Sequence, residues 1–75
     1  MSPATKSIII HALNGNLAVA RDNLYRACAT FRDCTPEQMA QPYGQSSQTR
    51  QEILDGYERR EAELRAAVAE VLALP

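Results

Sequence analysis

The sequence lacks tryptophan and has one phenylalanine, three tyrosines and one histidine among its 75 residues. A core must therefore be built from aliphatic and alanine side chains, which suit close helix packing better than a sandwich of β-sheets. The chain also has no Cys-x-x-Cys pair and no cluster of histidines, the usual donor sets of a zinc site. These absences favour an all-α protein and argue against a metal centre or a cofactor.

The two cysteines do not predict a disulfide, and the longest apolar run does not predict a membrane span. Cys28 and Cys34 are six residues apart, which places them on different faces of a helix and too far apart for a disulfide. We expect reduced thiols, with Cys28 in the core. Residues 8–13 are too short to span a membrane, and no signal-peptide pattern precedes them. We therefore expect a cytoplasmic protein.

Charge is nearly balanced, but it differs between the two halves of the chain. The formal net charge is -1, with a balance of +2 over residues 1–35 and of -3 over residues 36–75. This difference predicts that two arms of one chain attract each other. No face collects Lys and Arg side chains, so nucleic acid is not an expected partner.

The first arm carries apolar or small residues in steps of three and four, at Ile10, Leu13, Leu17, Ala20, Leu24, Ala27 and Phe31. This heptad repeat, opened by Ser2 as N-cap and Pro3 as first helical residue, predicts a helix over about 3–33. Asn14-Gly15-Asn16 is typical of a turn, so the helix either continues with a bend or stops at Gly15 and restarts. Continuity is favoured, because the heptad phase is unchanged across the glycine.

Two capping boxes mark the next helical segments. Thr35-Pro36-Glu37-Gln38 predicts a helical turn over 36–41, within a connector that spans 34–48. Gln41-Pro42-Tyr43-Gly44 is typical of a type I turn. Thr49-Arg50-Gln51-Glu52 predicts the start of a second long helix over about 49–73.

Two long helices joined by a short connector fold back antiparallel, so residues 1–75 should form one helical hairpin. A chain of this size is marginally stable alone, and a second subunit would cover the rest of its apolar stripes. We expect a homodimer, completed as a helical bundle. The residues expected in the core or the oligomer interface are Leu13, Leu17, Leu24, Phe31, Tyr57, Leu64, Val68 and Val71.

No catalytic site is evident, because His11 is the only histidine and no base is placed to activate a serine, threonine or cysteine. Arg60-Glu61 interrupts the second apolar stripe, either as a polar layer that fixes an interface or as a solvated pair. Tyr43 either anchors a partner or covers the end of the hairpin. The outer helix faces around Arg21, Arg59 and Glu63 are the competing partner sites.

In size, Ala and Arg content and hairpin layout, the chain resembles small accessory proteins of phages and prophages. Pro42-Tyr43-Gly44-Gln45-Ser46 and Thr49-Arg50-Gln51-Glu52-Ile53-Leu54 carry that similarity. The resemblance implies a protein that binds and blocks a host enzyme or a defence complex.

The sequence as a whole predicts a non-catalytic protein-binding module that self-associates and binds another protein. One alternative is an oligomeric sponge that holds an anionic nucleotide between protomers. A small DNA-binding regulator is the other, although the basic patch and recognition-helix pattern are missing.

Overall fold

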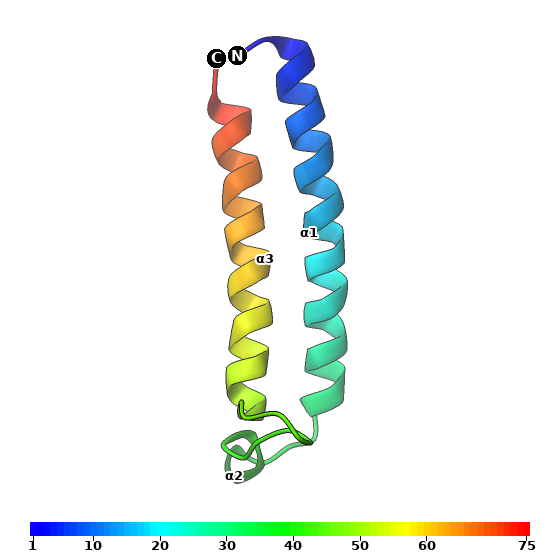
Figure 1. The fold of residues 1–75 in the computed structure, drawn as a ribbon, viewed down its shortest axis with the longest axis vertical. Helices are drawn as coiled ribbons and strands as arrows, with labels where there is room; N and C mark the ends of the chain where they lie inside the picture. Colours follow the sequence, from blue (N-terminus) through cyan, green and yellow to red (C-terminus); the bar gives the residue numbers. More distant parts are fainter.

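The computed structural model describes all residues 1–75 and shows an all-α helical hairpin (Figure 1). Helix α1 spans Pro3–Phe31, α2 spans Pro36–Met39 and α3 spans Arg50–Ala73. The two long helices lie side by side and antiparallel, so both termini lie at one end and α2 with the connector lies at the other (Figure 1). None of the helices combines the length and the apolar character that crossing a membrane requires.

Helix α1 is continuous through Gly15, as the undisturbed heptad phase predicts. Its N-terminus is capped by Ser2, whose hydroxyl accepts a 3.2 Å hydrogen bond from the backbone N–H of Thr5, with Pro3 as the first helical residue. The helix ends at Phe31, two residues before the predicted boundary, where the N–H of Cys34 donates to the Phe31 carbonyl.

The connector folds as a short helix followed by a small hairpin of extended backbone. The capping box of Thr35 and Gln38 is present, but α2 ends at Met39 rather than at residue 41. The predicted type I turn over 41–44 is wrong, because the turn lies two residues later. There the N–H of Ser46 donates to the carbonyl of Tyr43 at 3.0 Å, with Gly44 in the left-handed region at φ +58°. A positive φ at that position alone is the pattern of a type II′ turn.

Helix α3 begins with the predicted capping box, since Thr49 and Glu52 satisfy each other's backbone N–H groups. The last backbone carbonyls of α3 accept hydrogen bonds from a side chain of α1. Lys6 Nζ donates to the carbonyl oxygen of Leu72 at 3.0 Å and to that of Leu74. A lysine is well suited to this position, because the C-terminal carbonyls of a helix have no partner within the helix.

The core is a narrow seam between α1 and α3. Five residues are buried, and Leu17, Ala20 and Leu64 form its central cluster. Among the residues predicted to lie inside, Leu17, Phe31 and Leu64 are buried. Four others are half-buried: Leu13, Leu24, Val68 and Val71.

One expectation about buried residues is wrong, because Cys28 is exposed, as a free thiol. Tyr57, expected in the core or the oligomer interface, is 39% exposed within one chain and stays a prediction for the interface. The physical reason for both exposures is the same. A helix with one neighbour covers only a narrow stripe of its surface, so positions on the flank of the stripe stay in contact with solvent.

Gly15→Ala should stabilise the hairpin by about 0.5–1 kcal/mol, because alanine costs less entropy than glycine in a helix. A Cβ at Gly15 would meet no atom within 4 Å. Gly44→Ala is the matched control and should destabilise by about 1–2 kcal/mol, since its φ is left-handed. Thermal melts at one protein concentration measure both changes. A lower melting temperature for Gly15→Ala would contradict a relaxed helix at that residue.

Leu64→Ala should destabilise the hairpin by about 2–5 kcal/mol, because the truncation empties the centre of the buried cluster. Leu72→Ala removes the same atoms from the same helix at a side chain that is 56% exposed. That control should change stability by about 0.5 kcal/mol or less. Urea denaturation gives both values, and similar losses for the two variants would place the inner face of α3 elsewhere.

Candidate functional site

The hairpin exposes more surface than a folded monomer of its mass normally does. Its accessible surface is 5451 Å², whereas a compact monomer of 8.3 kDa exposes about 4,600 Å². The radius of gyration is 16.1 Å, against about 11 Å for a compact chain of this length. The excess of about 900 Å² is close to the roughly 800 Å² that each partner contributes to a standard protein interface.

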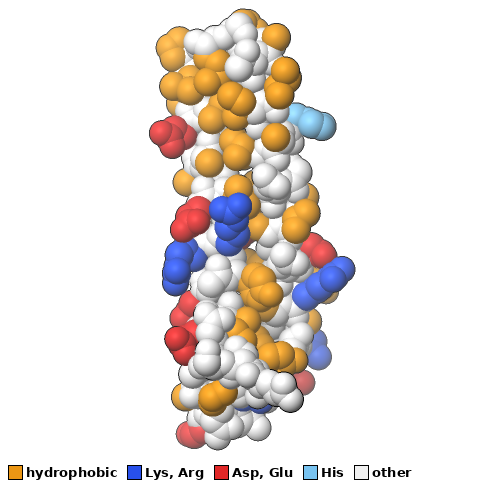
Figure 2. Space-filling view, in the orientation of Figure 1, with side chains coloured by type: hydrophobic (Ala, Val, Ile, Leu, Met, Phe, Trp, Pro, Cys, Tyr) orange, Lys and Arg blue, Asp and Glu red, His pale blue; other side chains and the backbone are white.

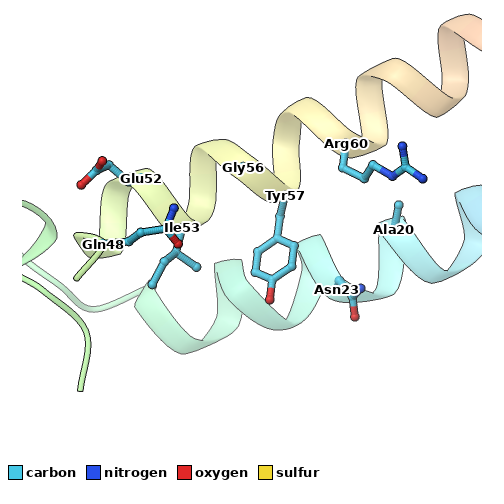
Figure 3. Close-up of a pocket in the computed structure, with 8 residues that line it drawn as sticks. All are labelled: Ala20, Asn23, Gln48, Glu52, Ile53, Gly56, Tyr57 and Arg60. Carbon is cyan, nitrogen blue, oxygen red and sulfur yellow. The ribbon is translucent and has the colours of Figure 1, made fainter. Parts of the chain in front are cut away.

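Three adjoining hollows form a groove along one side of the seam between α1 and α3. Their volumes are about 390, 290 and 140 Å³, and Asn23 lines all three. Figure 3 shows the largest, where the Tyr57 ring extends from α3 toward α1 and Arg60 lies over Ala20. Each hollow is open to solvent, so it suits a side chain from outside the hairpin better than an enclosed ligand.

The groove lies between two stripes of heptad spacing, which together we call the groove face. On α3 the stripe is Ile53, Tyr57, Arg60, Leu64, Ala67, Val71 and Leu74. On α1 the stripe contains Asn16, Val19 and Asn23, which line the hollows, and the same spacing continues it to Ile9 and Ala12. Val19 is 61% exposed on this face although it is a large aliphatic residue. Arg60 is the only charged residue of the α3 stripe. On α1 the same spacing continues beyond Asn23 to Arg26, which lines the second hollow and pairs with Asp22 at 3.1 Å.

Charge is also distributed unevenly along the length of the hairpin. Residues 1–20 and 66–75, the end that holds both termini, contain only Lys6 and Glu70 as charged side chains. Figure 2 shows hydrophobic side chains over much of both helices at this end and more charged ones over the rest. We call these two segments the apolar end. Ile8 and Leu72 are both more than half exposed there, so the apolar end is far from fully buried within one chain.

Arg60 and Glu61 lie on two sides of α3, so they do not act together as one pair. Glu61 lies between the helices, with its side chain 14% exposed, and pairs with Arg21 and Arg65 at 3.4 Å each. Arg60 instead lies on the groove face. The Arg21–Glu61 contact is the one ion pair that joins the two long helices. Direct ionic attraction between the arms is therefore confined to this one point, although the two arms differ in net charge.

The other predicted partner residues lie on the surface without forming one site. Arg21 is tied to Glu61 but still 59% exposed. Arg59 and Glu63 are exposed on α3. Asp55 forms no ion pair with Arg59, four residues later, and instead accepts a 2.8 Å hydrogen bond from Gln51. Asp22–Arg26 and Glu61–Arg65 are ion pairs of this i,i+4 spacing.

Tyr43 belongs to the closed end of the hairpin. Its ring packs edge-on against Phe31, with ring centroids 5.1 Å apart. The guanidinium carbon of Arg50 lies 5.5 Å from the centre of the same ring. This arrangement favours the covering role over the anchoring role for Tyr43, although the residue remains 44% exposed.

Arg50 joins the connector to α3, a role that was not predicted from the sequence. Its Nη1 donates to the carbonyls of Gln38, Gln41 and Pro42 at 3.1–3.3 Å, and its backbone N–H donates to Gln41. One signal could have revealed it. A cation in the first turn of a helix opposes the helix dipole, so its presence there calls for a separate partner.

His11 is exposed on α1 and lines none of the hollows. No three His, Cys, Asp or Glu side chains gather where they could hold a metal ion. The largest hollow contains Arg60 and Tyr57 beside Glu52, whose carboxylate points away from them (Figure 3). A nucleotide site between protomers stays a prediction.

Comparison with known proteins found no matching family model, no similar curated protein and no similar solved structure.

Tyr43→Ala should destabilise the hairpin by about 1–3 kcal/mol, because it removes the aromatic pair with buried Phe31 and the ring beneath Arg50. Tyr25→Ala is the control, since Tyr25 is 75% exposed and should cost about 0.5 kcal/mol or less. Urea denaturation of the two variants compares them directly. If Tyr43→Ala and Tyr25→Ala are equally stable, the Tyr43 ring does not stabilise the hairpin and is a candidate anchor for a partner instead.

Proposed function

We propose that this chain is a small, non-catalytic protein-binding module that self-associates and acts by holding another protein. The observation that carries the proposal is the groove face, which is open to solvent. It carries a largely aliphatic α3 stripe and the exposed Val19, and its two stripes run on into the apolar end. An apolar surface of this extent on a chain with five buried residues favours association with protein.

The remaining surface supplies the second contact of the proposal. Arg21, Tyr25, Arg59 and Glu63 are exposed away from the groove, and both arginine and tyrosine are enriched where proteins bind each other tightly. Binding alone suffices for an inhibitor, because a stoichiometric blocker needs no chemistry of its own. The exposed free thiol of Cys28 supports action in a reducing compartment such as the cytoplasm.

Light scattering coupled to size exclusion tests the self-association directly. At micromolar concentration the particle mass should be at least twice the chain mass of 8.3 kDa, and dilution should lower both the mass and the melting temperature, because association stabilises the folded chain. A particle of one chain mass, with a melting temperature independent of concentration, would refute the self-association.

A further inference from the structure

We propose that a second copy of this chain docks on the groove face with the termini of both copies at the same end of the assembly. The two-fold axis runs parallel to the long axis of the hairpin. The α1 of each copy then packs against the partner's α3, and the four helices form a bundle in which neighbours are antiparallel. This inference rests on the proposed self-association and specifies its surface and its direction.

Area supports a second copy as the occupant. The surplus of about 900 Å² over a compact monomer is close to the roughly 800 Å² that one side of a standard interface hides. A symmetric dimer places the same face on both sides, so two grooves with their exposed aliphatic rims cover each other. The opposite side of the seam is less suited, because the ionic cluster of Arg21, Glu61 and Arg65 lies on it.

The distribution of charge along the hairpin selects the direction. Two hairpins can pair face to face with the same ends together or with opposite ends together. In the second arrangement, the apolar end of one copy would lie against the half of the other in which the charged residues Arg26 and Glu52 line the groove. With the same ends together, Ile9, Val71 and Leu74 of each copy lie against the partner's apolar end instead. Burial of apolar surface against apolar surface favours this arrangement.

Arg60 supports the same direction independently. It lies next to Glu61, which pairs with Arg21 in the middle of α1, so Arg60 is near the middle of a hairpin that is 50 Å long. With opposite ends together, the two α3 helices adjoin and the two Arg60 side chains meet, which is repulsive. With the same ends together, each Arg60 faces the other copy's α1. There it meets a second Asn16 and Asn23, which lie at the height of Arg60 in the same hollow.

Such a contact gives Arg60 the amide oxygens of asparagine as acceptors. A polar layer within an apolar helical interface fixes the register of the helices. The arginine that interrupts the second stripe thereby acquires a role that the isolated hairpin does not give it. Its side chain would specify how the copies align, whereas the aliphatic residues would supply the binding energy.

Val19→Arg tests the surface. Val19 is 61% exposed in the hairpin and lies on the groove face, so the substitution should leave helicity unchanged but weaken dimerisation by about tenfold or more, because an arginine would be buried without a partner. Tyr25→Arg is the matched control on α1, at a residue 75% exposed and outside the groove. Sedimentation measures both, with circular dichroism as the check on folding. Loss of the dimer in Tyr25→Arg alone would overturn the groove as interface.

Spin labels test the direction in a chain that folds normally. With Cys28 and Cys34 changed to Ser, a nitroxide is attached at Ala4→Cys in one sample and at Asp33→Cys in another. Both residues are exposed; Ala4 lies in the first turn of α1 and Asp33 lies two residues beyond its last residue. Since α1 is about 43 Å long, same-end pairing should give distances between copies of about 20–30 Å at both sites. Distances beyond about 40 Å at both would overturn the inference while leaving self-association intact.

A mixed sample completes the design, with one copy labelled at Ala4→Cys and the other at Asp33→Cys. Its distance between copies should be long when the same ends pair and short when opposite ends pair. A sample that shows no dipolar coupling between copies, and one chain mass by light scattering, would instead refute the proposed self-association itself. The two failures are therefore distinguishable.

Discussion

The packing of Leu64 against Leu17 and Ala20 is the contact on which the rest of the hairpin depends. It is the only buried cluster in the middle of two helices, and it sets their separation and phase. The alanine permits the close approach that brings Glu61 within reach of Arg21. Because one seam of this width hides so little surface, the same packing that defines the hairpin also leaves its flanks exposed.

Polar contacts organise both ends of the hairpin, beyond the buried cluster at its centre. Lys6 joins α1 to the last carbonyls of α3, while Arg50 gathers three connector carbonyls beside Tyr43. Each satisfies backbone groups that would otherwise depend on water. Since these contacts are largely exposed, they define the geometry of the ends more than they add to stability.

The fold could be read from the sequence because its signals are local. The heptads, Ser2, and the boxes at Thr35 and Thr49 each act within one turn of helix, so their positions follow from spacing alone. The type II′ turn at Gly44 and the role of Arg50 could not, because they depend on how the connector folds back on itself. Cys28 was misplaced for a related reason: spacing shows which face points inward, but not how far one neighbouring helix can cover it.

The candidate site was harder to predict because it consists of the surface that the packing of α1 against α3 leaves exposed. Arg60 and Glu61 are adjacent and similar in sequence context, yet one step of 100° around the helix places Glu61 in an ionic cluster and Arg60 on the groove face. The sequence could show that a polar layer interrupts the stripe, but not which residue belongs to which side. Once the seam is fixed by Leu64, that assignment follows. On the groove face, Arg60 is then a cation without an ionic partner. In the proposed dimer, its hydrogen-bond acceptors are Asn16 and Asn23 of the second copy, which lie at the same height along the hairpin.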